Sequence, residues 1–140
     1  MKKIIFGCDH NGFVLKEGLM VFTKNLGYNV TDCLAENYVD LTRKVVDQIG
    51  ANEGAMGVLI CGSGFGMCMA ANRYPKIRAA VCRNWEDAEF CRRQNDANVI
   101  CFGSEFTPLN RAMECLQHFI ERPFKKERHQ EHVNKLLKIS

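Results

Sequence analysis

Short apolar runs alternate with amphipathic helical segments along most of this chain, and this alternation constrains the fold more than any other feature. Apolar runs of strand length are predicted at residues 3–8, 28–33, 56–61, 77–82 and 98–103. Helices are predicted between and after them, at residues 15–26, 38–49, 67–73, 85–94, 109–120 and 126–137. This order predicts an α/β fold of three α/β/α layers, in which helices cover both faces of a five-stranded parallel sheet and an extra helix follows at the C-terminus.

Chain length and charge exclude several classes of protein. A chain of 140 residues predicts one domain, spanning residues 1–140. The net charge of +3 is too small to indicate a nucleic-acid partner. No apolar segment reaches the roughly 18 residues that span a bilayer, and no signal peptide precedes the first strand. We therefore expect a cytoplasmic protein with no membrane partner.

The chain contains eight cysteines, but their spacing indicates neither a disulfide framework nor a metal site. No Cys-x-x-Cys pair is present, and most of the cysteines fall within apolar runs, where a free cysteine is usually a small core residue. His129 and His132 lack the further ligands that a metal site needs. No metal and no cofactor are expected.

Cys61 differs from the other cysteines because it ends an apolar run and is followed by the turn Gly62-Ser63-Gly64-Phe65-Gly66. Glycines let such a turn bring several backbone N–H groups close to a ligand. Donors at the start of a helix suit an anion or a developing oxyanion, and they also favour thiolate over thiol. A carbon base and an oxyanion site are therefore predicted side by side. A redox role is the alternative, with Cys68 as the nearest cysteine in sequence.

Asp9 and His10 follow the first predicted strand. In open parallel sheets, ligands bind outside the carboxyl ends of the strands. We therefore expect this carboxylate and this imidazole at the same edge of the sheet as Cys61.

These segments resemble the ribose-5-phosphate isomerase B and galactose-6-phosphate isomerase family almost end to end. The matching pieces are GCDHNGF (7–13), LKE (15–17), LICGSGFG (59–66), AANR (70–73), IRAA (77–80), NDANV (95–99) and RHQ (128–130). The resemblance implies a Rossmann-like aldose–ketose isomerase that needs no metal. It also implies a sugar-phosphate ligand and a homodimer or tetramer with active sites at the dimer interface.

The resemblance implies roles for the residues of the first and third predicted strand ends. Cys61 would move a proton between C1 and C2 of an open-chain sugar phosphate, through a cis-enediolate. Ser63 would assist oxygen protonation or ring opening. Asp9 would contact sugar hydroxyls and His10 would help to hold phosphate. The enediolate oxygen would be held by backbone amides of the turn, namely those of Gly62, Ser63, Gly64 and Gly66.

The resemblance also implies substrate-binding residues in the C-terminal half, and here the chain departs from the family. Gln94, next to Asn95, stands where the family has a histidine that opens the sugar ring, and glutamine cannot exchange a proton near pH 7. Glu105 stands where ribose-phosphate isomerases have a phosphate-binding arginine. Arg128 and His132 share a helical face where the family has two phosphate-binding arginines. Without the resemblance, this basic segment is typical of a solvated helix.

These departures leave three hypotheses. The first is an active isomerase for which ribose 5-phosphate is a poor substrate, acting on a sugar such as an open-chain tetrose phosphate. The second is a subunit of a hetero-oligomeric galactose-6-phosphate-type isomerase, whose partner supplies the missing groups. The third is a non-catalytic sugar-phosphate-binding protein. The intact Cys61 and glycine turn favour the first, because a binding protein needs no carbon base.

Overall fold

The computed structural model describes residues 2–139, apart from the side chains of residues 127 and 128. A five-stranded parallel sheet has the strand order β2-β1-β3-β5-β4. The strands are β1 (Lys3–Cys8), β2 (Asn29–Asp32), β3 (Met56–Cys61), β4 (Ala79–Val81) and β5 (Val99–Gly103). The predicted α/β class and the five parallel strands are confirmed.

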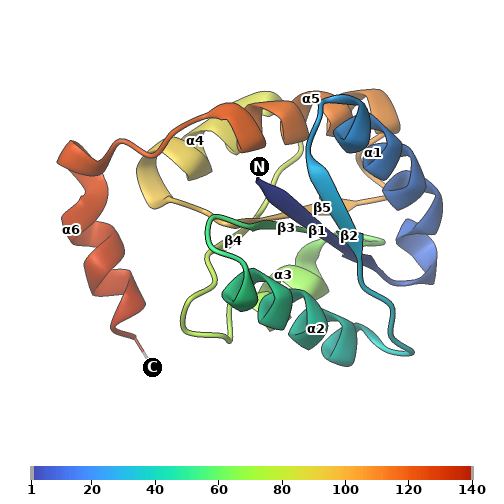
Figure 1. Cartoon of the computed structure of the whole chain (residues 1–140), viewed down its shortest axis with the longest axis horizontal. Helices are drawn as coiled ribbons and strands as arrows, with labels where there is room; N and C mark the ends of the chain where they lie inside the picture. Colours follow the sequence, from blue (N-terminus) through green and yellow to red (C-terminus); the bar gives the residue numbers. More distant parts are fainter. Residues whose placement is uncertain (1, 140) are drawn as a thin grey trace.

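Helices cover both faces of the sheet (Figure 1). The helical segments are η1 (His10–Gly12), α1 (Phe13–Asn25), α2 (Tyr38–Ala51), α3 (Phe65–Ala71), α4 (Trp85–Asn95), α5 (Leu109–Glu121) and α6 (Lys126–Leu137). α1, α4 and α5 cover one face, α2 and α3 cover the other, and α6 extends from the end of the α4–α5 layer. Among residues 2–139, no helix is long and apolar enough to cross a membrane.

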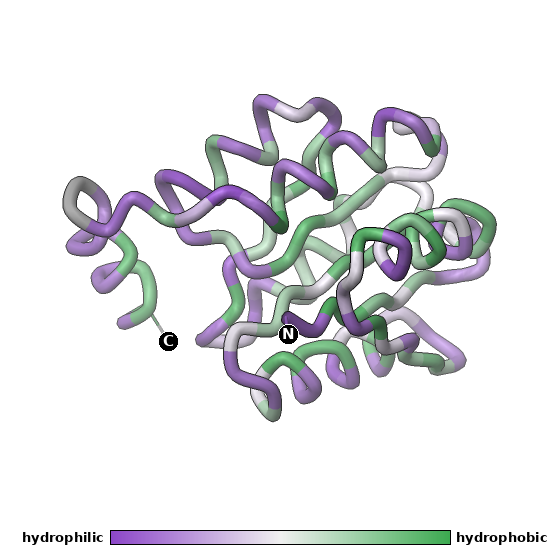
Figure 2. The backbone as a smooth tube through the Cα atoms, turned by 45° about the horizontal axis from the view of Figure 1, so that its top comes forward, coloured by the Kyte–Doolittle hydropathy of each residue, from purple (hydrophilic) through white to green (hydrophobic). Residues whose placement is uncertain are grey.

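Two apolar cores fill the spaces between the layers, and β3 contributes to both. Val58 and Ile60 pack toward α1, α4 and α5, whereas Leu59 and Cys61 pack toward α2 and α3. This alternation follows from the strand period of two residues, and burial of both faces is why the whole strand is apolar. The hydropathy colouring shows apolar central strands and polar outer helical turns (Figure 2).

Several predicted boundaries were wrong by one or two residues. The edge strands β2 and β4 are shorter than the apolar runs at 28–33 and 77–82. At β4, the amide of Arg78 donates to the side chain of Asn98 (2.8 Å) before the strand ladder begins. α3 begins at Phe65 rather than at Met67, because Gly64 supplies a left-handed N-cap with φ of 84°.

Candidate active site

Cys61 lies at the carboxyl end of the central strand β3, directly before the glycine turn. It pairs in register with Gly103, the last residue of β5. Its side chain is buried, with 9% of the residue exposed, whereas Gly62 and Ser63 are partly exposed. The sulfur therefore lies just beneath the surface of the turn.

The turn after Cys61 is held against the loop after β5. The amide of Ser104 donates to the carbonyl oxygen of Cys61 (2.8 Å), and the amide of Glu105 donates to that of Gly62 (3.0 Å). A side chain at position 103 would collide with this turn, because a Cβ there would lie 2.5 Å from the carbonyl oxygen of Ser63. Two loops that are distant in sequence thus fix each other's position.

The backbone amide of Gly64 donates to the Sγ of Cys61 over 3.1 Å. Such a donor stabilises a thiolate more than a thiol. This amide therefore donates to the sulfur, whereas the family resemblance implied that it would face an oxyanion. Within residues 2–139, no protein acceptor binds the amides of Gly62, Ser63 or Gly66, which remain as donors for a ligand oxygen.

The Ser63 hydroxyl lies in the same turn. Its oxygen accepts a hydrogen bond from the amide of Phe65 (3.1 Å), which orients the side chain at the start of α3. The hydroxyl proton is left to donate, so the group can pass a proton between neighbouring oxygens.

Asp9 lies beside Cys61 at the same edge of the sheet, as predicted from the topology. Its amide donates to the carbonyl oxygen of Ile60 (3.1 Å), at the end of the adjacent strand. Its carboxylate oxygen Oδ1 accepts hydrogen bonds from the amides of Asn11 (2.9 Å) and Gly12 (3.2 Å). Asp9 therefore caps η1, and this capping fixes the direction of the carboxylate.

Asp9 and the exposed His10 line a cleft of about 280 Å³ between η1 and the loop at residues 34–38. Lys16, which was not predicted as a site residue, also lines this cleft. It is 1% exposed and its Nζ donates to the Asp32 carboxylate (2.7 Å). A lysine among the apolar positions of α1 is the one sequence signal that could have identified it. Larger cavities, of about 600 and 820 Å³, lie away from Cys61.

The other cysteines near the strand ends are poor candidates for a base. Burial raises the pKa of the Cys8 thiol, which adjoins Asp9, and of the Cys33 thiol after β2. The fully buried Cys101 in β5 also has a raised pKa, because its thiol donates to Cys68 and lies out of water. A raised pKa keeps a thiol protonated at neutral pH.

Glu105 faces the glycine turn. A Cβ on Gly62 would lie 3.8 Å from the Glu105 carboxyl carbon and 3.9 Å from the Asn11 side-chain nitrogen. A negative charge therefore stands next to the amides that are available to a ligand oxygen. This placement disfavours a second negative group, such as phosphate, at the same point.

Gln94 and Asn95 lie at the opposite edge of the sheet. They end α4, which runs antiparallel to the strands, and Asn95 lines the cavity at the amino ends of β4 and β5. Gly57 pairs with the first residue of β5, so Cys61 is about 13 Å further along the sheet. One chain therefore does not bring these residues to Cys61.

The exposed His132 lies on α6, close to the end of α4. The amide of Lys125, which precedes α6, donates to the carbonyl oxygen of Arg93 (3.0 Å). The predicted role of Arg128 falls on a side chain outside the described residues. The predicted residues thus form two groups, one at the carboxyl edge of the sheet and one where α4 meets α6.

The fold and the placement of these residues define an α/β protein with a ligand site at the carboxyl edge of a parallel sheet. The family model described as Ribose/Galactose Isomerase matches residues 4–136, and the chain belongs to this family. It is therefore an aldose–ketose isomerase of the sugar-phosphate class, an intramolecular oxidoreductase, as the resemblance implied.

Individual relatives agree with this assignment. The chain is 35% identical over 144 residues to ribose-5-phosphate isomerase B of Escherichia coli (strain K12), covering 99% of this chain and 97% of that protein. The structure of ribose 5-phosphate isomerase B from Thermotoga maritima matches with a TM-score of 0.93 at 34% identity, over 98% of both chains. The structure of the Mycoplasma genitalium enzyme with bound ribulose-5-phosphate matches with a TM-score of 0.92 at 30% identity, over 98% of this chain and 95% of that chain.

Proposed function

We propose that Cys61 is the base that moves a proton between C2 and C1 of a phosphorylated aldose. The observation that carries this proposal is the hydrogen bond from the Gly64 amide to the Cys61 sulfur, 3.1 Å long, beside further amides that are open to a ligand. A thiolate and an oxyanion site in one turn are the two groups that enolisation of a sugar requires.

The reaction proceeds from the open-chain aldose. The Cys61 thiolate removes the proton from C2, the C–H electrons form the C1=C2 bond, and the carbonyl π electrons move onto O1. The amides of Gly62 and Ser63 hold the negative oxygen of this cis-enediolate. The Ser63 hydroxyl passes a proton from O2 to O1, and the Cys61 thiol returns its proton to C1. The product is the ketose, and both enzyme groups regain their starting states.

The ligand is a sugar phosphate, and we propose that ribose 5-phosphate is a poor substrate. The Mycoplasma genitalium relative was solved with ribulose-5-phosphate, which supports a phosphorylated sugar of similar size. Glu105 beside Gly62 opposes a phosphate at that point, and Gln94 cannot open a sugar ring by proton transfer. A substrate that is already open-chain, such as a tetrose phosphate, avoids the second problem.

Two copies of the chain complete the site. The groups at the end of α4 and on α6 lie too far from Cys61 in one chain, so we propose that a second copy supplies them. These groups are Gln94, Asn95 and His132, and we extend the proposal to Arg128 from the family resemblance. The assembly is a homodimer or a tetramer of single-domain chains spanning residues 1–140.

The test is a panel of four-, five- and six-carbon aldose and ketose phosphates incubated with the purified chain and followed for interconversion. We expect turnover of at least one pair, with ribose 5-phosphate slower than the best substrate. Ribose 5-phosphate as the best substrate would contradict the specificity proposal. Turnover only after addition of a paralogous subunit would support the hetero-oligomer, and binding of sugar phosphates without turnover would support the binding protein.

A further inference from the structure

Cys82 and Cys91 form a close pair of thiols outside the candidate active site. Cys82 follows β4, Cys91 lies in the second half of α4, and their Sγ atoms are 3.9 Å apart. A disulfide needs about 2.0 Å between the sulfurs, so the gap to be closed is about 1.9 Å, within the reach of side-chain rotation. We propose that Cys82 and Cys91 are a dithiol site that a small-molecule disulfide oxidises to an intramolecular disulfide.

The two thiols differ in pKa, and this difference predicts which of them reacts first with the oxidant. The contact between the two thiols lowers the pKa of Cys91. The same interaction, together with burial, raises the pKa of Cys82 well above its ordinary value. Cys91 is therefore the attacking thiol and Cys82 the resolving thiol.

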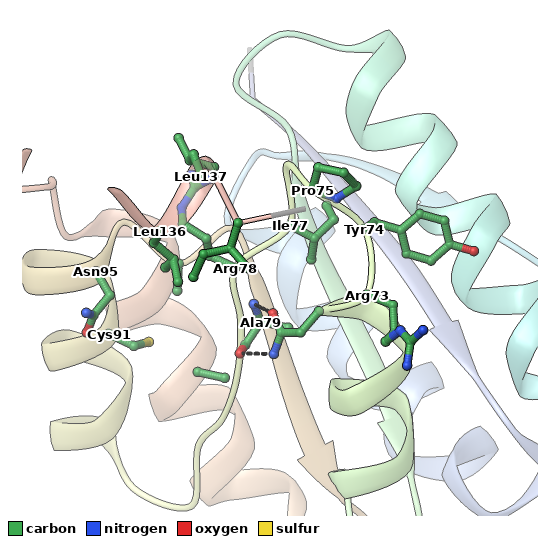
Figure 3. Close-up of a pocket in the computed structure, with 14 residues that line it drawn as sticks. Arg73, Tyr74, Pro75, Ile77, Arg78, Ala79, Cys91, Asn95, Leu136 and Leu137 are labelled. Atoms are coloured by element: carbon green, nitrogen blue, oxygen red, sulfur yellow. Dashed lines mark hydrogen bonds between the residues drawn. The ribbon is translucent and has the colours of Figure 1, made fainter. Parts of the chain in front are cut away.

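Solvent access follows the same order. Cys91 is half-buried and lines the cavity of about 600 Å³ between α4, the last turn of α6 and the segment at residues 72–80. Figure 3 shows its sulfur projecting from α4 toward this cavity, with Leu136 and Leu137 above it in the view. Cys82 is only 1% exposed. A reagent in the cavity reaches Cys91 first, and Cys82 completes the reaction from inside.

The reaction balances with oxidised glutathione as the oxidant. The Cys91 thiolate attacks one glutathione sulfur, and the first glutathione leaves as a thiolate. The Cys82 thiolate then attacks the Cys91 sulfur, and the second glutathione leaves. In sum, the two cysteines lose two protons and two electrons, and one glutathione disulfide becomes two glutathione thiols.

Cys68 and Cys101 are the competing pair. The Cys101 thiol lowers the pKa of Cys68, but Cys101 is fully buried within β5. Cys68 also donates to the carbonyl oxygen of Ala79 (3.5 Å), which directs its thiol toward β4. The Cys91 thiol makes a similar bond to the carbonyl oxygen of Ala88 (3.4 Å), and the direct contact of the Cys82 and Cys91 sulfurs at 3.9 Å is why we expect this pair to oxidise first.

The chain offers a direct readout, because trypsin cleaves after Arg78, Arg83 and Arg92. Cys82 then lies in the peptide 79–83 and Cys91 in the peptide 84–92, which remain joined only if the disulfide has formed. The reduced full-length protein is incubated with oxidised glutathione, quenched with acid, alkylated and mapped by mass spectrometry. The first product we expect is the joined pair of peptides, which dithiothreitol separates.

Two variants sharpen the result. Cys91→Ser should abolish the joined peptides and leave Cys82 without glutathione, because Cys82 is buried. The matched control Cys68→Ser should leave the joined peptides unchanged. A lasting glutathione adduct on Cys91, or earlier linkage of Cys68 to Cys101, would overturn the proposal. The wild-type map decides the question even if a variant fails to fold, and it is independent of isomerase activity.

Discussion

Gly103 and Ser63 approach each other so closely that no side chain fits between them. A Cβ on residue 103 would lie 2.5 Å from the Ser63 carbonyl oxygen. Gly103 ends β5 and pairs with Cys61, so this contact sets the height of the glycine turn above the sulfur. The geometry of the candidate active site therefore depends on a residue that contributes no functional group.

The substitution Gly103→Ala tests this dependence. The obstructing atom belongs to backbone, so the turn must shift, and we expect a loss of about 1–3 kcal/mol in unfolding free energy. We also expect kcat/KM to fall under conditions where the variant is still folded, because the Gly62 and Ser63 amides move with the turn. Chemical denaturation and kcat/KM measurements check both effects. The control is Gly50→Ala on α2, where a Cβ meets no atom within 4 Å. Equal behaviour of the two variants would contradict the proposed role of the contact.

Glu105→Gln tests the electrostatic effect of the carboxylate beside Gly62. Removing this charge should lower KM for aldose phosphates about fivefold, which corresponds to roughly 1 kcal/mol of like-charge repulsion in a hydrated site. The effect should shrink as salt is added, because salt screens exposed charges. Steady-state kinetics at two ionic strengths measure both trends. Glu53→Gln, in an exposed turn far from Cys61, is the matched control. An unchanged KM for Glu105→Gln would contradict the inference that this carboxylate opposes binding of the phosphorylated substrate.

Subunit complementation tests whether two chains share the site. Cys61→Ala and the double variant Gln94→Ala/Asn95→Ala should each be nearly inactive alone. Random mixing should restore roughly a quarter of wild-type activity, because half of the dimers are hybrids with one intact site. The mixture is unfolded, refolded and assayed beside the refolded parents. A mixture no more active than its parents would place the residues of one site on a single chain.

Glu89 in α4 forms an ion pair with Arg122, which follows α5, and the pH dependence of stability tests this pair. Arg122 hydrogen-bonds Glu89 and holds the pKa of that carboxyl below its usual range, with His118 adding to the effect. A lowered folded-state pKa contributes stability above the ordinary pKa of glutamate, and this contribution disappears as the pH falls through the folded-state value.

Glu89→Gln should therefore melt at a lower temperature than wild type at neutral pH, and the two melting temperatures should converge in acid. Thermal scans across the acidic range measure the difference. A difference that stays constant with pH would mean that the carboxylate charge contributes nothing.

Much of the fold was predictable because the hydrophobic period of each strand and helix, and the order in which they alternate, can be read directly from the sequence. The bounds of β1 and β3 were predicted to the residue, because each is a clear apolar run. The proximity of Asp9 to Cys61 was also predictable, because both follow neighbouring parallel strands. The edge strands were predicted too long at their starts, because the amides of Tyr28 and Ile77 donate to the carbonyl oxygens of Thr23 and Tyr74 rather than to a neighbouring strand.

The finer geometry of the site was not predictable, because it depends on contacts between segments that are distant in sequence. The direction of Glu105 follows from the pairing of the loops after β3 and β5. The donation from Gly64 to sulfur follows from a left-handed backbone conformation at a single glycine. The spacing of residues carries neither piece of information.

Solvent deuterium exchange tests the role of Cys61 most directly. The best sugar phosphate from the substrate panel is incubated in deuterated water with wild type or Cys61→Ala, and label at C1 and C2 is followed by NMR. We expect wild type to introduce deuterium at the carbon that receives the proton. The variant, with an unchanged circular dichroism spectrum, should lose at least about 10²-fold in rate. Exchange at the wild-type rate in Cys61→Ala would contradict the assignment of Cys61 as the base.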